Sequence, residues 1–443
     1  MFYFYTLHTN IKRQLTWGSN FHGQLGHRVN GVQSTDFQGP TSCHPMGMAL
    51  GQGRRASSIA CGTSYTMVLT DHFAVLACGI ALIAGHRDAQ NWGVPQEIPS
   101  LKGLPLVGMS AGDGHASVVT AHGTAYIWGE NRNGCCARAF PETMSLPVPV
   151  KAPSPSSHSN DVAIVHVACG LEHSVFVTRT GHLLVCGSNW SGQLGIAASE
   201  LQSTSAITPV RHPKGGSFVS VEAGNSHSLV LDSAGDLWVT NPNGLHCILR
   251  GKSVLALAAG GDNCIAITSA PHGVKSLQRQ FSMEMTVSRK SLVDEVNELL
   301  NDIEFVDTRK KHAGQEIAQK LEELLRYPSL LNFILNPAKV EEMFERCLCS
   351  NDVETKQIMA NSIERGMKVG LDSLRGSRMI YPEAVRCLLS YIKFFDIRRD
   401  DSVVFDVRGE VIFLFCDTIL GVPFEGYNGE VWPHVQLFFA IPR

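Results

Sequence analysis

No stretch of this 443-residue sequence is apolar for long enough to cross a bilayer, so we expect no membrane span. The most apolar late stretch, 410–424, is interrupted by Asp417 and Pro423. Residues 1–14 lack the basic region and the sustained apolar run of a signal peptide. Since these features are absent, we expect a cytoplasmic protein, and the nucleus is the alternative location.

The sequence also lacks an excess of positive charge. Its 37 basic and 40 acidic residues give a formal net charge of −3. General binding to nucleic acid or to anionic lipid depends on a basic surface, so we expect no direct DNA binding.

The 13 cysteines do not have the spacing of a disulfide framework. The Cys-x-Cys pair at 347–349 lacks the second pair that a zinc site needs. Four other cysteines lie in apolar runs flanked by Ala or Gly, and we interpret them as small core residues. They are Cys61, Cys78, Cys169 and Cys186.

Glycine and histidine are abundant before residue 270 and sparse after it. Sixteen of the 18 histidines lie in the first 272 residues, and the acidic excess comes from the second part. We therefore predict a first domain over 1–270, a linker over 271–290 and a second domain over 291–443.

The first part repeats one unit at intervals of about 50 residues. A short apolar run ends in glycine, a His or Tyr follows three residues later, and a Gly-containing turn then joins two further apolar runs. Such a hairpin cannot bury its faces alone, so the repeat predicts stacked four-stranded blades around an axis. We expect the glycines at positive φ or where backbones approach closely. The repeat positions are Gly62, Gly112, Gly170, Gly224 and Gly260, with His115, His173 and His227.

One loop of the unit occurs twice in nearly the same form, as GSNFHGQLG at 18–26 and GSNWSGQLG at 187–195. We interpret the seven matching positions as a frame that fixes the backbone, while the two central residues point outward. These pairs are predicted to bind a partner from one rim, and ordinary exposed loop residues are the alternative. The pairs are Phe21 and His22, Arg132 and Asn133, and Trp190 and Ser191.

The repeated histidines do not indicate chemistry. One histidine per blade places them apart, whereas metal ligands must converge on one point. We expect a ring nitrogen of each to bond a neighbouring backbone group. A serine follows each histidine, but no Asp recurs beside them, so a hydrolase triad has no support. We predict no catalytic residue, no cofactor and no metal.

The second part has helical periodicity. Segment 315–325 places Ile317, Leu321, Leu324 and Leu325 on one face, and similar stripes occur in 291–306, 338–349 and 382–395. Pro328 and Pro337 separate the segments. The stripes predict helices that pack on one another in an all-α domain.

The repeat unit resembles that of the regulator of chromosome condensation family, whose members form a β-propeller. The resemblance covers roughly residues 15–268, with five to six recognisable units. It implies a β-propeller, incomplete if no further unit closes it, followed by the all-α domain.

This order of domains resembles the HERC-type ubiquitin ligases, in which a catalytic HECT domain follows. Such a domain needs several hundred residues beyond Arg443, so we do not expect this chain alone to be an enzyme. The resemblance implies a protein-binding scaffold that recruits substrates or partners for a HERC-type ligase. The alternatives are a guanine nucleotide exchange factor for a small GTPase and a structural adapter without catalysis. In each case the partners are other proteins.

Overall fold

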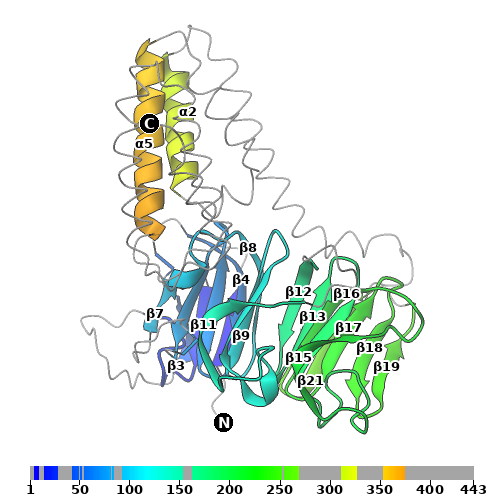
Figure 1. The fold of residues 1–443 in the computed structure, drawn as a ribbon. Coiled ribbons are helices and arrows are strands. Elements are labelled where there is room, and N and C mark those ends of the chain that lie inside the picture. Colours follow the sequence, from blue (N-terminus) through cyan, green and yellow to red (C-terminus); the bar gives the residue numbers. More distant parts are fainter. Residues whose placement is uncertain are drawn as a thin grey trace. The chain divides into compact units, whose positions relative to one another are not determined.

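The computed structural model describes eleven segments of the chain (Figure 1). They are 4–8, 14–27, 42–48, 50–51, 54–80, 82–83, 92–152, 162–251, 254–268, 311–326 and 353–374. The chain divides into two compact units, of which the first takes in 1–71, 75–98 and 106–285. The second takes in 72–74, 99–105 and 286–443.

The first unit contains six antiparallel sheets in the described residues, named blades 1 to 6 in chain order. Blade 1 has three strands: β1 (Phe4–His8), β2 (Gln14–Gly18) and β3 (Ser42–Gly47). Blade 2 has four: β4 (Ala56–Cys61), β5 (Tyr65–Thr70), β6 (Val75–Gly79) and β7 (Trp92–Glu97). Blade 3 has four: β8 (Leu106–Ala111), β9 (His115–Thr120), β10 (Ala125–Glu130) and β11 (Thr143–Pro149).

The remaining blades follow the same plan. Blade 4 has β12 (Ile164–Cys169), β13 (His173–Thr178), β14 (Leu183–Ser188) and β15 (Ser203–Val210). Blade 5 has β16 (Phe218–Ala223), β17 (Ser228–Asp232), β18 (Leu237–Asn241) and β19 (Gly244–Leu249). Blade 6 has β20 (Val254–Gly260) and β21 (Asn263–Thr268). Two short 3-10 helices, Pro99–Leu101 and Arg132–Gly134, lie between strands.

The central hairpins of blades 3, 4 and 5 match the sequence prediction. In blade 4, β13 and β14 pair antiparallel from His173 opposite Gly187 to Val177 opposite Leu183. Gly181 makes the turn with a φ of +82°, and its N–H donates to the carbonyl of Thr178 at 2.9 Å. A residue with a side chain would be strained at that φ, which is why the turn carries a glycine.

Neighbouring blades contact each other through their first strands. Strands β4, β8, β12, β16 and β20 form a series in which each contacts the next, and the sheets lie side by side in Figure 1. Each of these strands also has a bulge after its first paired residue. A bulge bends its strand, so all five first strands are bent at the same point. Repeated four-stranded blades in this arrangement are a propeller architecture.

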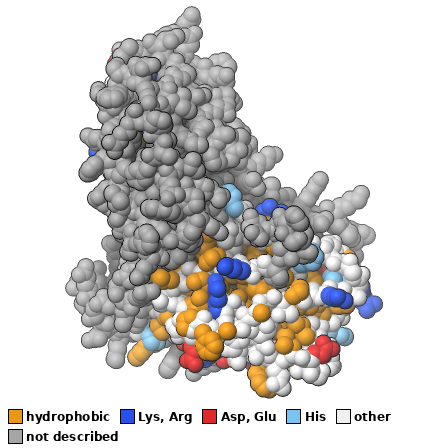
Figure 2. Space-filling view, viewed as in Figure 1, with side chains coloured by type: hydrophobic (Ala, Val, Ile, Leu, Met, Phe, Trp, Pro, Cys, Tyr) orange, Lys and Arg blue, Asp and Glu red, His pale blue; other side chains and the backbone are white. Residues whose placement is uncertain are grey.

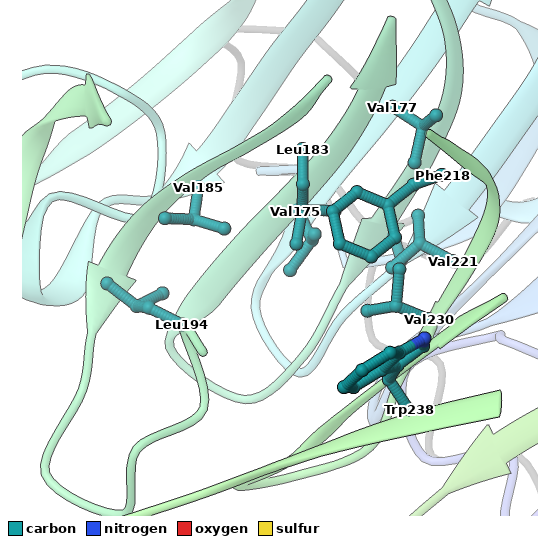
Figure 3. Packing of buried hydrophobic residues seen from close by; sticks show 10 residues of the cluster. Val175, Val177, Leu183, Val185, Leu194, Phe218, Val221, Val230 and Trp238 are labelled. Carbon is teal, nitrogen blue, oxygen red and sulfur yellow. The ribbon is translucent and has the colours of Figure 1, made fainter. Parts of the chain in front are cut away.

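Apolar side chains fill the space between successive blades (Figure 3). Between blades 4 and 5, Phe218 and Trp238 pack with Val175, Val177 and other aliphatic residues, and each is at most 4% exposed. Full burial of one such side chain stabilises a fold by about 1.5–3 kcal/mol. The blades are therefore held together chiefly by apolar packing between sheets.

The anchor glycines lie where two blades approach closely. A Cβ atom on Gly170 would lie 2.1 Å from Cε1 of His173 and 2.6 Å from the carbonyl oxygen of Gly224 in blade 5. A Cβ atom would be obstructed in the same way at three other anchor glycines, Gly62, Gly112 and Gly224. In each case the obstructing groups are the His or Tyr ring of the same blade and a glycine carbonyl of the next blade. None of these positions has a positive φ. At Gly260, in blade 6, nothing lies within 4 Å of such an atom.

The repeated histidines cross-link the blades, but their partners are not the backbone groups that the sequence predicted. Nε2 of each ring lies at hydrogen-bond distance from a side chain of the next blade. His115 reaches Ser174 Oγ at 2.8 Å, His173 reaches Ser228 Oγ at 3.0 Å, and His227 reaches Cys264 Sγ at 3.3 Å. Tyr65, at the same position in blade 2, donates its hydroxyl to the carbonyl of His115 at 2.6 Å. A polar seam therefore accompanies the apolar packing.

Three of the four cysteines interpreted as core residues, Cys78, Cys169 and Cys186, are buried. The prediction was wrong for Cys61, which is exposed at the end of β4. The described side chains of Cys78, Cys135, Cys136, Cys169, Cys186, Cys247 and Cys264 form no disulfide.

The second unit contains two described helices, α2 (Lys311–Leu325) and α5 (Val353–Leu374), which pack on each other. Ile317, Leu321 and Leu325 are buried, as the apolar stripe predicted. Helix α5 is not among the helices that the apolar stripes predict. The predicted helical segments 291–306, 338–349 and 382–395, the linker and the side chain of Leu324 lie outside the described residues.

Candidate protein-binding rim

Each four-stranded blade has two loops at the same end, because its strands are antiparallel. These loops join the first strand to the second and the third to the fourth. Blade 1 contributes the loop after β2 to this end, and blade 6 contributes the loop between β20 and β21. In blade 4 they are linked directly, since the N–H of Ser188 donates to the carbonyl of Glu172 at 2.8 Å. We call this end the loop rim. It comprises residues 19–27, 62–64, 112–114, 131–142, 170–172, 189–202, 224–227, 242–243 and 261–262.

A buried asparagine holds the repeated loop in all three of its copies. Asn20, Asn131 and Asn189 are each at most 5% exposed. The Oδ1 atom of each accepts a backbone N–H from five residues further on, at 2.9 Å. The amide Nδ2 of Asn189 also donates to the carbonyls of Ile196 and Leu201. Hydrogen bonds from the asparagine side chain therefore hold the backbone of the loop, which explains why asparagine recurs at this position.

The glutamine of the frame fixes the centre of the loop. Oε1 of Gln24 accepts the N–H of His22 at 2.8 Å, and Oε1 of Gln193 accepts that of Ser191 at 2.9 Å. In blade 3 the corresponding residue is Cys135, and the central Asn133 has a φ of +53°. The backbone around the central pairs is thus fixed before any partner binds.

The central pairs differ in what their side chains do. Phe21 is 55% exposed in blade 1 and Trp190 is 62% exposed in blade 4. Phe21 contacts the His22 ring edge-on at a centroid distance of 5.1 Å, and Ser191 is exposed. Phe21 and Trp190 are equivalent aromatic positions on two different blades, so the structure does not bring the three pairs together.

The pair in blade 3 is engaged within the chain. Asn133 Nδ2 donates to Oε2 of Glu172 in blade 4 at 2.7 Å. The Arg132 guanidinium lies 2.7 Å from a carboxylate oxygen of Glu130 and 4.0 Å from one of Glu172. Arg132 nevertheless keeps 56% of its side chain exposed.

Two exposed apolar residues of the rim were missed by the sequence analysis. Leu171 is 39% exposed in the first loop of blade 4, and Phe140 is 82% exposed in the second loop of blade 3. The sequence does contain a signal for Leu171, because it is an apolar residue at a position where other blades have a polar one. Those polar residues are Thr63, Asp113 and Asn225.

Backbone hydrogen bonds connect the rim from blade to blade. The N–H of Asp113 donates to Gly170 O at 3.2 Å, and that of Leu171 donates to Asn225 O at 3.2 Å. The N–H of Asn225 continues the series to Gly261 O at 2.7 Å. The first loops of blades 3 to 6 therefore form one connected surface.

Charge is distributed unevenly between the two ends of the blades. The described loop rim, counted with Glu130 at the end of its strand, has six acidic and two basic residues. They are Asp113, Glu130, Glu142, Glu172, Glu200 and Asp262, against Arg132 and Arg138. On the face shown in Figure 2, acidic side chains lie along the lower edge and Lys and Arg side chains lie above them. The net charge of −3 for the whole chain conceals this separation.

In the described segments, no three His, Cys, Asp or Glu side chains are arranged to hold a metal ion. Neither of the described helices is long and apolar enough to cross a membrane. What the rim offers is a fixed surface of aromatic, aliphatic and charged groups.

Comparison with protein families identifies the repeat. Residues 15–69, 122–177 and 180–231 match the Regulator of chromosome condensation (RCC1) repeat, and a second model of that repeat matches 164–193. The chain therefore contains RCC1 repeats. Each matched RCC1 segment runs from the last but one strand of one blade to the second strand of the next. One repeat thus contains its own bond between blades, such as the 2.9 Å bond from Ser228 Oγ to Gln193 O.

Similar curated proteins have different overall activities. Human probable E3 ubiquitin-protein ligase HERC6 is 28% identical over 206 residues, which are 46% of this chain and 20% of HERC6. The bovine secretion-regulating guanine nucleotide exchange factor is 33% identical over 153 residues, 34% of this chain and 33% of that protein. Xenopus laevis serine/threonine-protein kinase Nek9 is 24% identical over 298 residues, 59% of this chain and 30% of the kinase. The chain therefore spans a third or less of each of these relatives.

A solved structure shows the same fold. The crystal structure of human WBSCR16 superposes with a TM-score of 0.51 at 18% identity, covering 60% of this chain and 70% of that one. The repeats and the similarity to HERC6 support an RCC1-type, HERC-like protein, and the superposition shows the propeller fold.

Proposed function

We propose that this chain is a protein-binding scaffold that recruits a substrate or partner for a HERC-type ubiquitin ligase. The observation that carries the proposal is the repeated loop of the rim. Its buried Asn and Gln side chains fix the backbone, and Phe21 and Trp190 remain 55% and 62% exposed at equivalent positions. Preorganised exposed aromatic residues are typical anchors of protein interfaces.

The link to ubiquitin ligases is supported by the similarity to HERC6 over 46% of the chain. In that role the chain itself would perform no transfer reaction. Its contribution would be to hold the partner near a ligase.

The test is quantitative affinity purification of the full chain from cells, followed by mass spectrometry. Phe21→Ala and Trp190→Ala are compared with the wild type and with Ile248→Ala. Ile248 is 46% exposed on β19, away from the rim, and therefore provides a matched control. We expect specific partners to be lost in the rim variants and retained with I248A, and their ubiquitin-modified fraction to change when the chain is overproduced. An identical partner set in all four proteins would contradict the proposal.

A second candidate function is guanine nucleotide exchange on a small GTPase. The observation that favours it is the 33% identity to the bovine secretion-regulating exchange factor. It predicts that the purified chain accelerates release of fluorescent GDP from at least one member of a panel of small GTPases. Unchanged release across the panel would leave the scaffold function as the better account.

A further inference from the structure

Two loops of blade 4 place an apolar pair and a carboxylate at one point of the rim. The bond from Ser188 N–H to Glu172 O joins the loops. Leu171 and Trp190 each lie within two residues of that bond, and they are 39% and 62% exposed. We call Leu171, Glu172 and Trp190 the blade-4 patch.

The patch already lies against one guanidinium. Arg132 of blade 3 is held between Glu130, at 2.7 Å, and Glu172, at 4.0 Å. Two carboxylates share this single cation, so the group keeps a net negative charge. Glu172 also remains 28% exposed, and a second cation can approach it from solvent.

The surroundings disfavour an acidic partner. Counted with Glu130, the described loop rim has six acidic residues against two basic ones, so an approaching carboxylate or phosphate group is repelled. A basic partner is attracted by the same field. An indole face binds a guanidinium or ammonium group through its ring electrons, and Trp is the best of the aromatic residues for this contact.

We propose that the blade-4 patch binds an arginine- or lysine-bearing segment of a partner protein. The cation stacks on Trp190 with its charge toward Glu172, and its aliphatic stem lies against Leu171. This inference rests on the proposed scaffold function and specifies the chemistry of the partner. The blade-1 aromatic, Phe21, then adds a separate apolar contact on the same rim.

The test uses fluorescence anisotropy with the full chain and four synthetic probes of equal length. Each probe alternates glycine with arginine, lysine, leucine or glutamate. We expect the arginine and lysine probes to bind and to weaken as salt is raised, because the attraction is screened. Trp190→Ala and Glu172→Gln should each weaken binding by about tenfold, equivalent to about 1.4 kcal/mol. I248A should bind as the wild type does.

Glu172→Gln keeps an oxygen for the bond from Asn133, so it changes the charge while preserving the loop. A thermal melt of each variant checks that it remains folded. Preference for the leucine or glutamate probe, or no binding of the basic probes at up to about 1 mM, would overturn the inference. Those outcomes leave the scaffold function standing, because its own test is the partner set lost from the rim variants.

Discussion

The Nε2 atom of His173 in blade 4 lies 3.0 Å from the Oγ atom of Ser228 in blade 5. The Ser228 hydroxyl donates its single proton to the carbonyl of Gln193 at 2.9 Å. His173 must therefore supply the proton of the other bond, which makes it a neutral ring protonated at Nε2. Burial, together with the neighbouring His115 and His227, lowers the pKa of His173 to about 3 and keeps the ring neutral.

His173→Ala should destabilise the propeller by at least about 2 kcal/mol, because it leaves the buried Ser228 hydroxyl with one bond fewer and opens a cavity. A urea titration of the full chain, followed by the fluorescence of the buried tryptophans, measures the shift in midpoint. His122 lies in an exposed turn, so H122A is the control. Equal midpoints for H173A and H122A would show that the bond contributes nothing to stability.

Gly170→Ala and Gly260→Ala should behave differently, although the two glycines occupy the same repeat position. A methyl group on Gly170 would lie 2.1 Å from the His173 ring and 2.6 Å from Gly224 O, so the blades must separate. At Gly260 nothing lies within 4 Å. We expect G170A to lower the urea midpoint by an amount equivalent to about 2–3 kcal/mol and G260A to leave it nearly unchanged. Similar losses in both variants would place the cause in the backbone rather than in the contact between blades.

The contrast between these glycines also shows what the sequence could predict. The unit around Gly170 identified the hairpins, the four-stranded blades and the position of the rim loops, since each depends on local periodicity and turn residues. It could not distinguish positive φ from close approach at the anchor glycine. That distinction depends on the carbonyl of Gly224, which belongs to another blade.

The rim was predicted in part for the same reason. The loop frame identified Phe21 and Trp190, because the asparagine and glutamine that fix their backbone are within five residues. The engagement of Arg132 by Glu172 joins residues 40 positions apart, and no local pattern reports it. Helix α5 was missed although α2 was predicted, because its apolar positions are interrupted by polar residues such as Ser362, which is buried.

Glu222 should make the stability of the propeller depend on pH. Burial raises its pKa from the usual 4.5 to about 7, so the protonated form is favoured in the folded chain. The contribution of this raised pKa to the free energy of unfolding is complete below about pH 4.5 and is lost as the pH rises through 7. Relative to Glu222→Gln, the wild type should therefore lose stability between pH 5 and 7.5, as measured by urea midpoints. The pKa of His173 is lowered rather than raised, but His173 is present in both proteins, so its effect cancels in the comparison. If the urea midpoints of the two proteins changed in parallel with pH, Glu222 would not be the source of the pH dependence.

Gly366 of α5 lies in close contact with α2. A Cβ atom there would lie 2.6 Å from Leu325 Cβ and 2.8 Å from the carbonyl oxygen of Glu322. At a helix position with free space around it, Gly→Ala stabilises by about 1 kcal/mol through helix propensity. A destabilising effect would therefore show that the contact with α2 outweighs helix propensity. We expect Gly366→Ala to be destabilising, since the backbone of α2 cannot yield as a flexible side chain could.

Hydrogen exchange of the full chain, read in peptides covering 311–326 and 353–374, provides the measurement. G366A should exchange faster in both helices, because each one is protected by packing against the other. Val369→Ala is the control, since Val369 is 47% exposed on the same helix and its truncation should leave exchange unchanged or slower. Slower exchange in G366A would mean that helix propensity outweighs the contact, and that the two helices are not held at the separation seen here.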